Sequence, residues 1–241
     1  MATAALQVVV PILGYAQILG RTTGAEFQIA KTPLVPAGYA FSIWSVIFAT
    51  CALYAIEQAR PSRRSDPVLR RMGWPMAAAM GVNAAWSALA QIEIPLPALA
   101  PVLALGVVAA LTAASRLFGE AAGPVDWRVA SAVGLLAGWV TVAVFANLSV
   151  ALADVGLDWP GHQPQAVGLL STCGLLACAV LWRVRGAPTY LAAVVWGLVA
   201  LVVANLGREH APVVAATAGA WIVVAAAAAI LAWRRRGPAT A

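Results

Sequence analysis

Long apolar runs, separated by short segments rich in Arg, Pro and Gly, constrain this chain more than any other feature of its sequence. A bilayer core about 30 Å thick is crossed by about 20 apolar residues in a helix. By that measure the runs predict membrane-spanning helices at residues 4–20, 38–59, 72–91, 97–117, 129–152, 165–184, 188–206 and 212–233. Only 10% of the 241 residues are charged, whereas a soluble domain carries about 25%. We therefore expect an all-α, polytopic transmembrane bundle of about eight helices.

The basic residues predict how the bundle is oriented. The chain has 15 Lys and Arg residues, and all but Arg21, Lys31 and Arg208 fall on the side of the membrane that both termini share. Cytoplasmic loops carry the excess of basic residues. We therefore expect both termini in the cytoplasm and the protein in a plasma membrane, the inner membrane of a bacterium. Short clusters between apolar runs are not typical of a phosphate-binding face, so no nucleic-acid partner is expected.

The reactive residues argue against an enzyme and against a metal site. The three cysteines lie inside apolar runs and have no CxxC spacing. No Asp, Glu or His lies in the middle of a predicted span, which also argues against ion-coupled transport. His162 and His210 lie in outer loops near acidic residues, and solvated loop residues are the simpler interpretation of both. We expect no catalytic residues, no metal and no enzymatic activity.

Tryptophan is unusually frequent, with 10 residues against 5 Phe and 4 Tyr. Indole rings suit the headgroup region, and five tryptophans lie at span ends or in a loop: Trp74, Trp127, Trp159, Trp182 and Trp233. Five others lie inside the predicted spans: Trp44, Trp86, Trp139, Trp196 and Trp221. An indole N–H inside a membrane needs an acceptor. We expect these inner rings to face protein or a ligand, and lipid-facing or simple packing roles remain the alternative.

Polar side chains share helical faces with some of the inner tryptophans. In the third predicted span, steps of three and four residues align Asn83, Trp86, Ser87 and Gln91. In the fifth span, steps of four residues align Trp139, Ala143 and Asn147. The rise of 1.5 Å per residue places most of them in the membrane half away from the termini, beneath loop 21–37. Hydrogen bonding between helices is the commonest use of buried carboxamides, so packing and a polar, aromatic ligand cavity remain alternatives.

Three motifs carry a resemblance to a known family. The stretch from Lys31 to Trp44, KTPLVPAGYAFSIW, is similar to the loop and second-helix entry of the tryptophan-rich sensory protein family, which includes TspO and the translocator protein or peripheral benzodiazepine receptor. Asn83-x-x-Trp86 resembles the family's third-helix motif. Trp139-x7-Asn147 resembles the motif of the fifth helix. The motifs stand in the family's order.

The resemblance covers about residues 5–152 and implies a division of the chain. It predicts a five-helix unit over residues 1–152, with a three-helix transmembrane extension over residues 153–241. The chain departs from the family pattern at Ala37, where a second Pro is expected, and at Tyr39, which follows Gly38. The Leu, Tyr and Arg run that the family associates with cholesterol is missing after the fifth helix. No cholesterol binding is therefore inferred.

The activity that the resemblance implies is binding of a hydrophobic or tetrapyrrole-like small molecule, for sensing or transport. No resident cofactor is assigned, and a porphyrin is the implied ligand. Carried over position by position, the ligand-binding residues are Tyr39, Phe41, Trp44, Asn83, Trp86, Trp139, Ala143 and Asn147. The expected partners are this ligand and the lipid bilayer, and the family also implies a homodimer. The alternatives are a small-molecule permease of another class and a non-catalytic structural membrane subunit.

Overall fold

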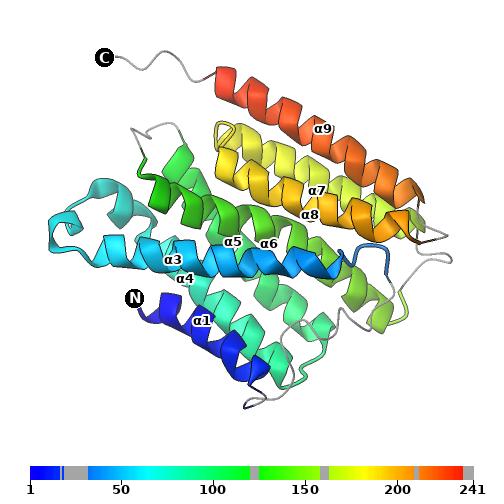
Figure 1. Cartoon of the computed structure of the whole chain (residues 1–241), viewed down its shortest axis with the longest axis horizontal. Coiled ribbons are helices and arrows are strands. Elements are labelled where there is room, and N and C mark those ends of the chain that lie inside the picture. The colour runs from blue at the N-terminus through cyan, green and yellow to red at the C-terminus, as the bar shows by residue number, and fades with distance from the viewer. Residues whose placement is uncertain (17, 19–31, 120–124, 158–162, 209–211, 236–241) are drawn as a thin grey trace.

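The computed structural model describes residues 1–16, 18, 32–119, 125–157, 163–208 and 212–235. Within these ranges the secondary structure is helical and contains no strand, so the predicted all-α class is confirmed. Figure 1 shows long helices that lie side by side. The α-helices are α1 (Ala2–Tyr15), α3 (Ile43–Ala59), α4 (Pro67–Gln91), α5 (Leu96–Phe118), α6 (Trp127–Asp154), α7 (Gln163–Arg183), α8 (Pro188–Leu206) and α9 (Pro212–Arg234). Two short 3-10 helices, η1 (Gly38–Ser42) and η2 (Pro61–Arg63), flank α3.

Six of the described helices are long and apolar enough to cross a membrane. These are α3 together with η1, and α5 to α9. The helix α1 is apolar but has 14 residues, fewer than the roughly 20 that a full crossing needs. The helix α4 has 25 residues but is less apolar than the six, because polar Asn83, Ser87 and Gln91 follow one face. It also begins five residues before the predicted span at residues 72–91.

Helix starts follow ordinary capping chemistry. The side chain of Asp66 accepts hydrogen bonds from the backbone N–H groups of Val68 and Leu69 at the start of α4. Asp126 caps α6 in the same way through the N–H of Arg128. Carboxylates in these positions satisfy amides that have no partner inside the helix and also face the positive end of the helix dipole. Two acidic residues of a chain that has 9 are thus used to begin helices.

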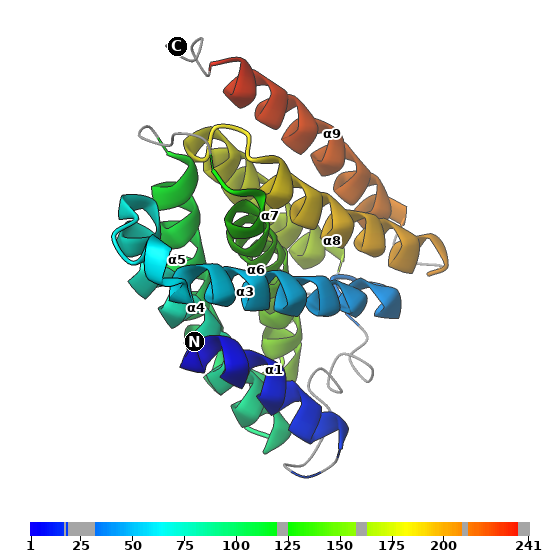
Figure 2. The same cartoon turned by 60° about the vertical axis from the view of Figure 1, so that its left-hand side comes forward.

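Five helices close into a ring. The helix α1 packs against α3 and α4, α4 packs against α5, α5 against α6, and α6 returns to α3. Figure 2 shows α1, α3 and α4 crossing on the side of α6 that lies away from α9. Ring closure is supported by Gln91 of α4, whose amide donates to the carbonyl of Val10 on α1 at 2.9 Å. Gln91 therefore joins helices, which is one of the two roles that its helical face allowed.

The last three helices pack against α6 from outside the ring. The helices α7 and α8 both contact α6, and α9 covers α7 and α8 (Figure 1). Glycine makes the approach of α8 close, because a side chain at Gly138 of α6 would collide with the backbone of Tyr190. The Tyr190 hydroxyl then donates to Thr141 on α6 at 3.1 Å. Whether residues 1–152 and 153–241 are separate units stays a prediction.

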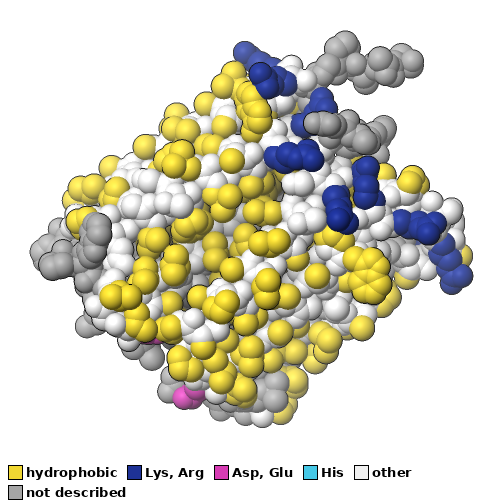
Figure 3. Space-filling model, turned by 180° about the vertical axis from the view of Figure 1, so that it is seen from behind, with side chains coloured by type: hydrophobic (Ala, Val, Ile, Leu, Met, Phe, Trp, Pro, Cys, Tyr) yellow, Lys and Arg dark blue, Asp and Glu magenta, His cyan; other side chains and the backbone are white. Residues whose placement is uncertain are grey.

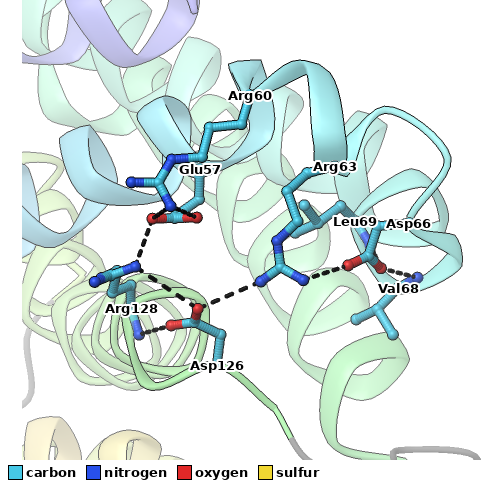
Figure 4. A network of polar contacts seen from close by, with 8 residues as sticks. All are labelled: Glu57, Arg60, Arg63, Asp66, Val68, Leu69, Asp126 and Arg128. Carbon is cyan, nitrogen blue, oxygen red and sulfur yellow. Dashed lines mark hydrogen bonds and ion pairs between the residues drawn. The ribbon is translucent and has the colours of Figure 1, made fainter.

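One end of the bundle carries a network of charges, and we call it the charged end (Figure 4). Glu57 of α3 is 2% exposed, and its carboxylate pairs with Arg60 at 2.9 Å and with Arg128 of α6 at 2.6 Å. Arg63 reaches Asp126 at 3.3 Å. Because charged groups are costly to bury alone, these pairs fix the end of α3 against the start of α6.

Basic side chains gather at the same end on the surface. Figure 3 shows Lys and Arg side chains clustered at one side of the face it presents, while hydrophobic and uncharged side chains cover most of the remainder. Contacts also bring distant basic residues together here, since Arg116 donates to the carbonyl of Arg71 at 2.9 Å and Arg235 lies 4.0 Å over the ring of Trp182. The arrangement is typical of a membrane protein with one basic rim.

Candidate ligand cavity

A cavity of about 350 Å³ lies inside the five-helix ring, toward the end opposite the charged end. We call this the cavity end. Its walls come from α1, the segment 32–37, η1, α3, α4, α5, α6 and α8. The volume lies within the range of about 300–1,000 Å³ that small-molecule sites occupy. The helices that line it follow one another around the ring, so the cavity is a direct consequence of ring closure.

Aromatic rings form one side of the cavity. Trp139 of α6 is 2% exposed and meets two rings edge to face, Phe41 and Trp44, each with centroids 6.2 Å apart. Trp44 in turn stacks on Phe48 at 5.4 Å. Edge-to-face and stacked pairs each contribute about 0.5–1.5 kcal/mol beyond their buried area. The cluster therefore holds Trp139 in one orientation, and its rings line one side of the cavity.

Three polar atoms at the cavity have no hydrogen-bond partner among the protein atoms that the structure describes. They are the indole N–H groups of Trp86 and Trp139 and the side-chain carbonyl of Asn147. The amide nitrogen of Asn147 is satisfied, because it donates to the carbonyl of Ala143 at 2.9 Å. A buried polar group without a partner costs about 1–3 kcal/mol. Three of the residues that line the cavity thus carry a buried donor or acceptor that has no partner among the described protein atoms.

The structure brings seven of the eight predicted ligand-binding residues to this one cavity. Those that line it are Phe41, Trp44, Asn83, Trp86, Trp139, Ala143 and Asn147. The eighth, Tyr39, does not line it, is 43% exposed and packs edge to face on Trp196 at 5.5 Å. Tyr39 and Phe41 lie on different sides of the short 3-10 helix η1, which explains why only Phe41 reaches the cavity. The ligand-binding role of all eight residues stays a prediction.

The other inner polar and aromatic residues are used in packing. Trp196 of α8 donates to the carbonyl of Ala40 at 2.9 Å. Trp221 of α9 fills the space that the missing side chain of Gly174 leaves on α7. Asn205 lies near the end of α8 and donates to the backbone instead of lining the cavity. The expectation that inner tryptophans face protein thus holds for these two, although Trp196 keeps 37% of its surface exposed.

Sequence reasoning missed several cavity residues. Phe48 stands four residues after Trp44 on the same face of α3, so helical spacing could have found it. Pro11 and Tyr15 of α1 have the same spacing. Gly197 and Leu201 of α8 also line the cavity, and they carry no polar or aromatic signal that would have marked them. Further lining residues are Leu34, Pro36, Gly38, Ser42, Ser45, Ser87, Leu103, Val140, Val142 and Ala146.

Most of loop 21–37, beneath which the cavity residues are predicted to lie, is outside the described residues, which include only residues 32–37 of it. Within that part, Leu34 and Pro36 line the cavity, as the predicted position of the loop requires. Both histidines, His162 and His210, also lie outside the described residues. Across the described part of the chain, no three His, Cys, Asp or Glu side chains come close enough to hold a metal ion.

Comparison with known families decides what kind of protein has this ring and cavity. A family model described as TSPO-like protein matches residues 1–231. The chain belongs to the TSPO-like protein family. Together with its apolar helices, this makes it an integral membrane protein. No match is found among curated proteins or among solved structures.

The family match extends further along this TSPO-like protein than the sequence motifs do. The recognised motifs end at Asn147, whereas the match continues through α7 and α8 and ends inside α9. The C-terminal helices are therefore included in the family match. The cavity also includes C-terminal residues that the family match covers, because Gly197 and Leu201 of α8 line it.

Proposed function

We propose that this TSPO-like protein binds a hydrophobic, tetrapyrrole-like small molecule in the cavity inside the five-helix ring, for sensing or transport. The observation that carries the proposal is the convergence of three tryptophans and two asparagines on one largely apolar cavity. Flat macrocycles stack on indole rings, and a few placed polar groups fix the orientation of an otherwise apolar ligand. The expected partners are this ligand and the surrounding lipid.

The unpaired atoms indicate which ligand chemistry fits. The indole N–H groups of Trp86 and Trp139 require acceptors such as carboxylate or carbonyl oxygens. The side-chain carbonyl of Asn147 requires a donor such as a pyrrole N–H. A tetrapyrrole carries both kinds of group on one flat, apolar frame. A purely hydrocarbon ligand would leave all three atoms unpaired, at a cost of about 1–3 kcal/mol each.

A porphyrin titration followed by quenching of tryptophan fluorescence tests this proposal. Trp139→Ala removes a ring from the wall of the cavity and is expected to weaken binding several-fold, since an aromatic pair contributes about 0.5–1.5 kcal/mol beyond its buried area. Trp233→Ala is the matched control, because Trp233 is exposed near the end of α9 and should leave affinity unchanged. Equal effects of the two substitutions, or no quenching in the parent protein, would contradict the proposal.

Trp139→Phe separates loss of the ring from loss of its N–H group. Trp139 is buried, so the alanine variant leaves a hole that also lowers stability. The phenylalanine variant retains aromatic packing against Phe41 and Trp44 but removes the donor. We expect its binding loss to be smaller than that of Trp139→Ala, with thermal stability close to that of the parent protein.

A further inference from the structure

Among the described residues of the three C-terminal helices, those that line the cavity belong to α8. Gly197 and Leu201 stand one turn apart and face the ring from outside. The lack of a side chain at Gly197 lets α8 approach Val142 of α6, because a Cβ atom there would come within 2.9 Å of the Val142 side chain. The five-helix ring alone therefore does not form the whole cavity wall, and α8 supplies the missing part.

The end of α8 also holds the chain segment that enters η1. The amide of Asn205 donates to the carbonyl of Pro33 at 2.8 Å. The guanidinium of Arg208 donates to the carbonyl of Thr32 at 3.1 Å and to that of Val35 at 3.5 Å. Burial lowers the pKa of Arg208, in agreement with a guanidinium that has exchanged part of its water for these carbonyl groups.

Two further bonds continue the attachment toward η1. The backbone N–H of Ala37 donates to the carbonyl of Ala200 at 3.1 Å. The indole of Trp196 donates to the carbonyl of Ala40 at 2.9 Å. The segment 32–40 is thus bonded to α8 at both of its ends. Because this segment carries the cavity residues Leu34 and Pro36, its attachment also fixes part of the cavity wall.

We infer that α8 completes the ligand cavity and that Asn205 and Arg208 are positioning residues, which hold segment 32–40 across the cavity and thereby set the rates of ligand entry and exit. The inference rests on the proposed ligand-binding function. Asn205 and Arg208 do not touch the ligand in this scheme. They act on it through the carbonyl groups of residues 32, 33 and 35.

The carbonyl oxygen of the Asn205 side chain supports a positioning role over a purely stabilising one. It has no hydrogen-bond partner among the described protein atoms, although Asn205 is 1% exposed. Leucine at this position would avoid that cost, so folding stability alone does not explain an asparagine. The amide nitrogen of Asn205 makes the bond to the segment. It donates to the carbonyl of Pro33 and also to that of Leu201 within α8, both at 2.8 Å.

The test uses the full chain in lipid nanodiscs and a porphyrin as the probe, with rates of binding and release measured by stopped-flow tryptophan quenching. The variants are Asn205→Leu, Arg208→Met and the two combined. Arg116→Met is the matched control, because Arg116 also donates to a backbone carbonyl, that of Arg71, at the charged end. We expect release to be at least tenfold faster in the double variant, which loses three hydrogen bonds to the segment, and within twofold of the parent in the control.

Hydrogen–deuterium exchange of the peptide covering residues 32–40 provides a readout that needs no ligand. The double variant should exchange faster there than the parent protein and the control, because the Ala37 amide is bonded to α8. Unchanged exchange would overturn the inference. Faster exchange with unchanged porphyrin release would also overturn it, since the attachment would then not control access. If the parent protein binds no porphyrin, the proposed function fails, and exchange alone still decides whether α8 holds the segment.

Discussion

The two ends of the helix bundle differ in how their most conspicuous buried polar groups are partnered. At the charged end, the carboxylate of Glu57 is almost fully buried and is met by two guanidinium groups. At the cavity end, two indole N–H groups and the side-chain carbonyl of Asn147 are buried with no partner among the described protein atoms. Proteins pair nearly all their buried polar groups. From this contrast we predict that the first set stabilises the fold and that the second set is available to the proposed ligand.

Topology is the prediction with the largest expected effect, because labelling from one side of a membrane is nearly all or none. The 11 described Arg residues on the predicted cytoplasmic side lie at loops and helix ends next to the charged end, and basic loops face the cytoplasm. We expect a cysteine placed at Gln163 to react with a membrane-impermeant reagent applied to intact cells, and one at Ser62 not to react. Cys178→Ser first removes the native cysteine that is incompletely buried.

The reverse labelling pattern would place the cavity end in the cytoplasm. The difference between the two ends in the pairing of buried polar groups would be unaffected, but a ligand would then enter from inside the cell. Labelling at both positions would show that the membrane was permeable in that experiment. A cysteine at Asp154, at the same end as Gln163, should react as Gln163 does and checks that the label reports the end and not one position.

Removing the central carboxylate of the charged end should destabilise the protein without changing ligand affinity. Glu57→Ala leaves Arg60 and Arg128 without their shared partner, and removing one member of a buried ion pair costs about 3 kcal/mol or more. Both arginines are partly exposed, so we expect a loss of about 2–3 kcal/mol in a thermal or denaturant melt. Asp154→Ala, at an exposed acid, should change stability by less than about 0.5 kcal/mol. A large loss of porphyrin affinity in Glu57→Ala would break the comparison.

Two substitutions on α6 sharpen the comparison within a single helix. Asn147→Leu removes a carbonyl that has no partner, so we expect unchanged or slightly higher stability together with porphyrin binding about tenfold weaker. Thr141→Val instead removes the acceptor of the buried Tyr190 hydroxyl. It should lower stability by about 1–2 kcal/mol and leave binding within twofold of the parent. A melt and a titration of the same two variants measure both effects, and similar profiles for the two would contradict the proposed division of roles.

Most of the helices could be predicted from the sequence because they are long apolar runs with Pro, Gly or charge at their ends. Both ends of α8 and the start of α9 agree with the predicted bounds. The early start of α4 was missed because Arg70 and Arg71 lie inside its first turns. A hydropathy measure ends a span at such charges, whereas a helix capped by Asp66 continues through them with its arginine side chains at the surface.

The site could be predicted only where side-chain chemistry marks it. Trp139 and Asn147 could be recognised in the sequence because their polar groups are costly to place in a membrane, and helical spacing aligns them. Gly197 and Leu201 are ordinary in an apolar helix, and only the packing of α8 on α6 brings them to the cavity. Tyr39 does not line the cavity, and a motif match gives no information on which side of the η1 turn a residue lies.

The place of α8 in the wall has a consequence for biogenesis. Helices enter the membrane in the order in which the ribosome makes them, and α8 follows all five members of the ring. The cavity therefore remains open on one side while the first five helices are already in lipid. A chain that stops after α6 would still contain three of the helices that are long and apolar enough to cross a membrane. Such a fragment would have membrane-spanning helices and tryptophans but would lack the part of the cavity wall that α8 supplies.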